Sequence, residues 1–73
     1  MPKFVLIGLK NFKSKDKTYN QAIIKDDDSN IIIVFITNEV YDFLKNYMYK
    51  EITSLCYLNY DRNTGFYRIS IEK

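Results

Sequence analysis

The run of residues 31–37 (IIIVFIT) restricts the fold of this chain more than any other segment. Consecutive β-branched residues lose side-chain freedom in a helix and pack well on a pleated sheet, so the run predicts a β-strand. Successive side chains of a strand point to opposite faces. Both faces are apolar here, one formed by Ile32, Val34 and Ile36 and the other by Ile31, Ile33 and Phe35. Because 73 residues leave room for one small core, we expect one of these sets to remain outside it.

Four further strands and one helix are expected around this run. Alternating and β-branched segments predict strands at residues 3–9, 18–25, 52–60 and 66–72. Apolar residues at three-and-four spacing predict a helix at residues 38–48, with Thr37 or Asn38 as its N-cap. The predicted fold is therefore all-β with one helix, in the order β-β-β-α-β-β, as a single domain over residues 1–73.

Local signals add detail to these elements. Gly8 indicates a bend or bulge in the first strand. The segments 26–30 (DDDSN) and 61–65 (DRNTG) carry turn-forming residues and should close two hairpins, with a positive φ at Gly65. On the last strand, one alternating set is expected to face the core, formed by Tyr67, Ile69 and Ile71.

The segment between the first two strands, residues 10–17 (KNFKSKDK), is polar and basic and is expected to be a loop. With the residues that follow, the stretch FKSKDKTYN resembles the first hairpin of small phage- and plasmid-type single-stranded DNA-binding proteins, where a lysine-rich turn precedes an aromatic residue on the second strand. The order of elements also resembles the OB-fold, a five-stranded Greek-key barrel. This resemblance implies binding of single strands through strands 2 and 3 and the loops joining strands 1 to 2 and 4 to 5.

Charge is sorted along the chain in a way that suits such a partner. The net charge is only +2, but residues 1–25 hold six lysines and one aspartate, whereas residues 26–51 hold six acidic residues and two lysines. Lysine and arginine attract the phosphates of a single strand, and its bases stack on aromatic rings. The residues expected to bind single-stranded DNA or RNA are Lys10, Phe12, Lys13, Lys15, Lys17, Tyr19, Gln21, Tyr60, Arg62, Phe66 and Arg68.

Each of these signals also has a simpler interpretation. Lysines are common on solvated turns and protect sheet edges, and an aromatic ring can serve packing as well as base stacking. Four aromatic residues fall on expected core faces, namely Phe4, Phe43, Tyr47 and Tyr67. The alternative function is a small protein-interaction module, such as a phage- or plasmid-encoded inhibitor or regulator of a host protein. The apolar third strand and the acidic middle segment favour this alternative.

The residue inventory argues against catalytic and metal chemistry. The chain has no histidine, one cysteine, no glycine-rich phosphate loop and no paired carboxylates on regular elements, so neither an enzyme nor a cofactor is expected. Asp26, Asp28 and Asn30 have the spacing of a calcium loop, but Ile31 and Thr37 stand where that loop needs glycine and glutamate. Cys56 lies in an apolar run and is expected to be a small buried hydrophobic residue.

Location and assembly can also be predicted. No run approaches the ~18 apolar residues of a membrane span, and the N-terminus lacks the pattern of a signal peptide, so a cytoplasmic chain is expected. The apolar set that residues 31–36 leave outside the core would invite aggregation on so small a domain. A homodimer or larger homo-oligomer that covers this set is therefore expected.

Overall fold

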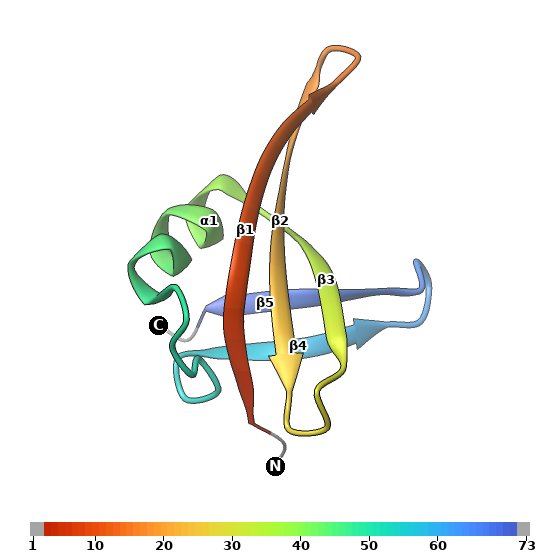
Figure 1. Cartoon of the computed structure of the whole chain (residues 1–73). Helices are drawn as coiled ribbons and strands as arrows, with labels where there is room; N and C mark the ends of the chain where they lie inside the picture. The colour runs from red at the N-terminus through yellow and green to blue at the C-terminus, as the bar shows by residue number, and fades with distance from the viewer. Residues whose placement is uncertain (1–2, 72–73) are drawn as a thin grey trace.

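The computed structural model describes residues 3–71 and is predominantly β-strand with one short helix (Figure 1). The strands are β1 (Phe4–Ser14), β2 (Lys17–Asp26), β3 (Ile31–Ile36), β4 (Cys56–Asp61) and β5 (Phe66–Ile71). The helix α1 (Asn38–Leu44) continues into the 3-10 turn η1 (Lys45–Tyr47). The predicted order of five strands and one helix is confirmed. No helix among the described residues is long and apolar enough to cross a membrane.

The strands form two open sheets. β1, β2 and β3 make one antiparallel sheet in that order, and β4 and β5 make an antiparallel hairpin that runs across it (Figure 1). β3 lies beside β5. Among residues 3–71 no continuous ladder joins the two sheets, so the expected closed barrel is not observed.

The segment after the helix explains why the sheets stay open. The N–H of Ile52 donates to the carbonyl of Phe4 at 3.1 Å, and the N–H of Leu6 donates to the carbonyl of Lys50 at 3.1 Å. These bonds occupy the outer edge of β1, where β4 would have to pair to close a barrel. β4 consequently begins at Cys56, and the strand expected from residue 52 is wrong over its first four residues.

The first hairpin is longer than the sequence pattern indicates. β1 continues to Ser14 and β2 begins at Lys17, so the loop expected at residues 10–17 is reduced to a tight turn in which Lys15 has a φ of 57°. Cross-strand pairing of Phe12 with Tyr19 extends the ladder into this polar segment. The resulting arm projects beyond the rest of the domain (Figure 1).

A bulge near Gly8 sets which side chains of the arm face the core. The pairing register between β1 and β2 shifts between Leu6 and Gly8, which confirms the predicted irregularity. Leu6 is fully buried, and after the shift the side chain of Lys10 falls on the opposite face. A Cβ added at Gly8 would lie 3.2 Å from Cδ1 of Ile23, so little space is available for a larger residue.

The core lies between the inner faces of the two sheets and the helix. Its fully buried members are Leu6, Ala22, Ile24, Val34, Leu44 and Ile52. Val34 is the buried member of its set on β3, whereas Ile31, Ile33 and Phe35 are 55%, 54% and 43% exposed. One apolar set of this strand therefore remains outside, as predicted. We call the face of the β1–β2–β3 sheet that carries this set the outer face.

Three other local predictions are confirmed. Ile69 is buried while Phe66 and Arg68 are exposed, so β5 presents the expected sides. Gly65 has a φ of +76° in the turn between β4 and β5. Thr37 caps α1, since its hydroxyl accepts a hydrogen bond from the N–H of Val40 at 3.3 Å.

Candidate nucleic-acid interface

Four exposed aromatic rings form a continuous row across four strands. The ring of Phe12 on β1 stacks on Tyr19 of β2 at a centroid distance of 5.6 Å. Tyr19 meets Phe35 of β3 edge to face at 6.1 Å, and Phe35 meets Phe66 of β5 in the same way at 5.9 Å. These residues are 37% to 55% exposed, so their rings remain accessible. We call them the aromatic row.

Strand register places this row on the outer face. Phe12 pairs with Tyr19, and Gln21, two residues further along β2, pairs with both Lys10 and Phe35. Residues two apart on a strand share a face, so Gln21 and Lys10 lie on the same side as the rings. Three of the four rings were predicted as site residues, and the structure brings them together.

Phe35 is the residue that sequence reasoning missed as part of the site. Its alternation with Ile31 and Ile33 assigned it to the apolar set expected to meet a protein surface. In the structure it lies between Tyr19 and Phe66 and completes the row. The sequence signal that could have identified Phe35 is that it is the aromatic residue in an otherwise aliphatic run.

The hairpin lysines do not share one face. Lys17 pairs with Ser14 and is two residues from Tyr19, so it extends the side that carries the aromatic row. Lys13 pairs with Thr18 and points to the opposite side of the arm, and Lys15 occupies the turn. The predicted cluster of lysines therefore surrounds the tip of the arm, and Lys10 and Lys17 are its members beside the rings.

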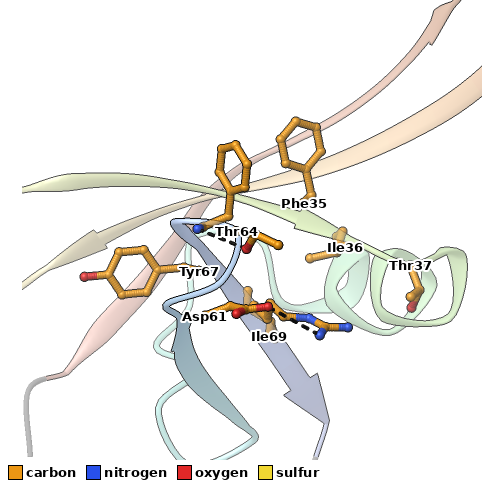
Figure 2. A pocket seen from close by; sticks show the side chains of 9 residues that line it. Phe35, Ile36, Thr37, Asp61, Thr64, Tyr67 and Ile69 are labelled. Atoms are coloured by element: carbon orange, nitrogen blue, oxygen red, sulfur yellow. Dashed lines mark hydrogen bonds and ion pairs between the residues drawn. The ribbon is translucent and has the colours of Figure 1, made fainter.

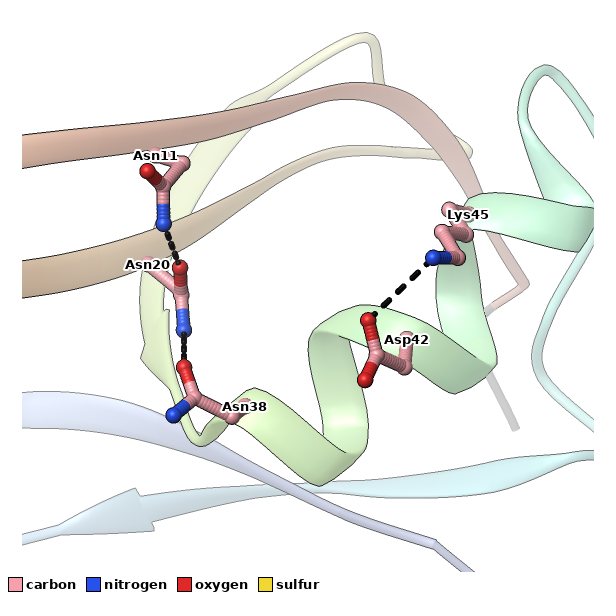
Figure 3. Close-up of polar contacts among 5 residues, drawn as sticks. All are labelled: Asn11, Asn20, Asn38, Asp42 and Lys45. Atoms are coloured by element: carbon pink, nitrogen blue, oxygen red, sulfur yellow. Dashed lines mark hydrogen bonds and ion pairs between the residues drawn. The ribbon is translucent and has the colours of Figure 1, made fainter.

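A ladder of asparagine side chains anchors the arm to the body of the domain (Figure 3). Asn11 donates from Nδ2 to Oδ1 of Asn20 at 2.5 Å, and Nδ2 of Asn20 donates to Oδ1 of Asn38 at 2.6 Å. Asn20 is buried, and Asn38 is the first residue of α1. The ladder thus links β1, β2 and the helix directly behind the aromatic row. On the solvent side of the helix, Asp42 and Lys45 form an exposed ion pair of 3.3 Å (Figure 3).

A groove lies between β3 and β5 at the end of the row. It has a volume of about 490 Å³ (Figure 2). Its lining consists of the aromatic residues Phe35, Phe66 and Tyr67, the aliphatic residues Ile36 and Ile69, and the polar residues Thr37, Thr64, Asp61 and Arg68. The carboxylate of Asp61 accepts a hydrogen bond from the N–H of Asn63 at 2.9 Å and lies 3.9 Å from the Arg68 guanidinium. Aromatic surface and hydrogen-bonding groups therefore meet in one groove, a combination typical of ligand-binding sites.

Two predicted site residues lie apart from the row. Tyr60 packs against Tyr67 with ring centroids 5.1 Å apart and an interplanar angle of 66°. Tyr60 and Tyr67 are paired on the face of the β4–β5 hairpin that carries Ile69, whereas Phe66 lies on the other face. Arg62 lies in the turn that follows β4. The structure joins Phe66 and Arg68 to the aromatic row and leaves Tyr60 and Arg62 outside it.

Two titratable groups outside the aromatic row, Cys56 and Asp26, have shifted pKa values with structural causes. Cys56 is a buried free thiol whose Sγ donates to the carbonyl of Ile52 at 3.4 Å, and burial raises the pKa of this thiol to about 11. The carboxylate of Asp26 accepts hydrogen bonds from the N–H groups of Asn30 and Asp28 at 2.9 Å each, and the bond from Asn30 is the main cause of its lowered pKa. Within residues 3–71, no group of three His, Cys, Asp or Glu side chains is placed to hold a metal ion.

The geometry of the outer face is thus the basis for assigning a function. It combines adjacent exposed rings, a lysine-bearing arm and a groove with hydrogen-bonding groups. Comparison of the chain with protein-family models, with curated proteins and with solved structures finds no significant match.

Proposed function

We propose that the protein binds single-stranded nucleic acid, most readily DNA, on its outer face and without catalysis. The observation that carries this proposal is the aromatic row, whose exposed rings lie beside Lys10 and Lys17. Base stacking on such rings contributes about 1–3 kcal/mol per base and needs no particular sequence. Lysines add attraction to the phosphate chain.

We further propose that the domain is an OB-type barrel whose seam between β1 and β4 is open. Its element order and the position of β3 beside β5 support this relationship. In OB-folds the second and third strands carry the oligonucleotide, and here β2 and β3 supply the two central rings, Tyr19 and Phe35. The long first hairpin takes the place of the binding loop between strands 1 and 2.

Fluorescence anisotropy with labelled oligo-dT, oligo-rU and duplex DNA of about 30 nucleotides tests the proposal at ~50 mM salt and micromolar protein. We expect binding to the single strands, weaker binding to the duplex, and affinity that falls as salt rises because lysines displace counterions. Absence of binding to either single strand would refute the function. Equal affinity for single strands and duplex would show that charge alone is responsible.

A protein-interaction module is the second candidate, and one observation favours it. Ile31 and Ile33 are each more than half exposed beside the aromatic row. Bases stack on aromatic rings, and aliphatic side chains do not provide such a platform. If the oligonucleotides fail to bind, this apolar part of the outer face would favour a protein partner, such as the target of a small inhibitor or regulator, over nucleic acid. The two candidates differ in their salt dependence, since burial of apolar surface is not weakened by salt.

A further inference from the structure

The outer face carries opposite charge at its two ends. The tip of the β1–β2 hairpin, residues 13–17, holds three lysines and one aspartate. The turn at the other end of β2, residues 25–30, holds three aspartates and one lysine. Strand register places Lys25 on the outer face and Asp26 on the inner face, so the acidic charge of this end comes from Asp27 and Asp28 in the turn. The two turns lie at opposite ends of the sheet (Figure 1), separated along β2 by residues 18–24, or about 26 Å of strand from residue 17 to residue 25.

Exposed apolar side chains occupy most of the outer face between these ends, together with the polar side chains of Lys10 and Gln21. Tyr19, Phe35, Ile33 and Ile31 follow one another from the basic end toward the acidic end. Removal of such surface from water is favourable by about 25 cal/mol per Å². The outer face is thus an apolar strip with a basic end and an acidic end.

A strip of this kind is complementary to itself in only one orientation. In a two-fold dimer the same surface meets itself, and two sheets packed face to face can have their strands parallel or antiparallel. The parallel arrangement would place the acidic turns of both copies together and the basic tips together. The antiparallel arrangement places each basic tip against the partner's acidic turn and each apolar centre against the other.

We propose that a second copy of this chain covers the outer face in the antiparallel arrangement, with the two-fold axis crossing the strands near Ala22 and Val34. These residues pair with each other and lie about midway between the two charged turns. Three strands about 4.8 Å apart give the strip a width of roughly 14 Å, so about 26 Å of strand presents roughly 360 Å² per copy, a size typical of weak and transient interfaces. The dimer dissociates readily and is weakened by salt, because part of its affinity comes from the charged ends.

Self-association on this face regulates the proposed binding of nucleic acid. Tyr19 and Phe35 cannot stack on bases while they pack against a second copy, so a single strand and the second copy compete. This consequence rests on the proposed function, whereas the dimer itself does not. The dimer is measured without nucleic acid, so a failure of the dimer proposal can be distinguished from a failure of the proposed nucleic-acid binding.

Charge exchange between the two ends tests the arrangement. One variant carries Lys15→Glu and Lys17→Glu, which makes both ends acidic, and a second carries Asp27→Lys and Asp28→Lys, which makes both ends basic. Light scattering after size exclusion, at low salt and micromolar protein, should give a mass near 8.8 kDa for a monomer and about twice that for a dimer. Circular dichroism and melting curves verify that each variant is folded.

We expect the wild type to dimerise, each charge variant alone to dimerise at least tenfold more weakly, and an equal mixture of the two variants to form a mixed dimer. Ile33→Lys should dissociate the wild-type dimer at any salt concentration. A wild type that stays monomeric up to several hundred micromolar overturns the proposal. A wild-type dimer accompanied by a mixture that remains monomeric overturns the antiparallel arrangement.

Discussion

Replacement of Phe35 by Ala tests the aromatic row at its centre. The Phe35 ring contacts Tyr19 at 6.1 Å and Phe66 at 5.9 Å, so its removal interrupts the row and leaves two separated parts. Loss of one stacking platform costs about 1–3 kcal/mol, which corresponds to a rise in Kd of about 5- to 150-fold for oligo-dT. The slope of log K against log salt should not change, because no charge is removed.

The same substitution should lower stability without unfolding the domain. An aromatic pair contributes about 0.5–1.5 kcal/mol, and the partial exposure of Phe35 places its two contacts near the lower limit. The two contacts together contribute about 1 kcal/mol, and loss of the half-buried ring surface adds about 1 kcal/mol. A total of about 2 kcal/mol lowers the melting temperature by about 8–16 °C in a domain of this size. The fold therefore survives, and a loss of binding can be attributed to the ring.

Tyr57→Ala supplies the matched control. Tyr57 lies on β4 outside the row and is 50% exposed, against 43% for Phe35. Anisotropy is measured at protein concentrations below those at which light scattering detects dimers, so that self-association does not alter the apparent Kd. Wild-type affinity in Phe35→Ala, or an equal loss in both variants, would show that bases do not stack on the aromatic row.

Other contacts lead to further expected outcomes. Lys17→Gln should reduce the magnitude of the slope of log K against log salt by about 0.7. Lys13→Gln should change this slope less, because Lys13 lies on the opposite side of the arm. Equal changes in the two variants would contradict binding of the strand on the side that carries Lys17. Asn20→Leu removes two hydrogen bonds of about 0.5–1.5 kcal/mol each and should lower the free energy of unfolding in urea by about 1–3 kcal/mol. A loss below about 0.5 kcal/mol would argue against the ladder. Burial raises the pKa of Cys56 from 9.0 to about 11, so the thiol of the folded protein should react with a disulfide reagent at pH 8 only as fast as the protein opens. For the same reason the unfolded thiol ionises first, so stability should fall as pH rises from 9 toward 11, and Cys56→Ala should remove that decline.

The elements that could be predicted are those whose signals are local. The turn at residues 26–30 forms because the carboxylate of Asp26 bonds backbone N–H groups two and four residues away, a property of the residue type. The apolar run of β3 could be identified as a strand with one exposed set. Which set is exposed depends on pairing, since Val34 lies opposite Ala22 and both face the core. That information is held by the neighbouring strand and not by the run itself.

The features that could not be predicted depend on contacts between distant segments. Residues 10–14 look like a loop because they are polar, but they pair with β2 once Phe12 meets Tyr19 and Asn11 meets Asn20. Ile52 looks like the start of a strand, but it is fully buried while its N–H bonds the edge of β1. The bond that occupies the edge of β1 thus comes from a residue that was expected to belong to the fourth strand.

The candidate site shows the same dependence on pairing. Basic and aromatic residues were expected to converge on one surface, and the apolar set of β3 was expected to form a separate surface for a partner. Strand register merges the two, because Phe35 belongs to the apolar set and also contacts Tyr19 and Phe66. The proposed single strand and the proposed second copy would therefore use one face, and their binding would be mutually exclusive. Under these two proposals the protein concentration sets how much of the protein is free to bind a strand.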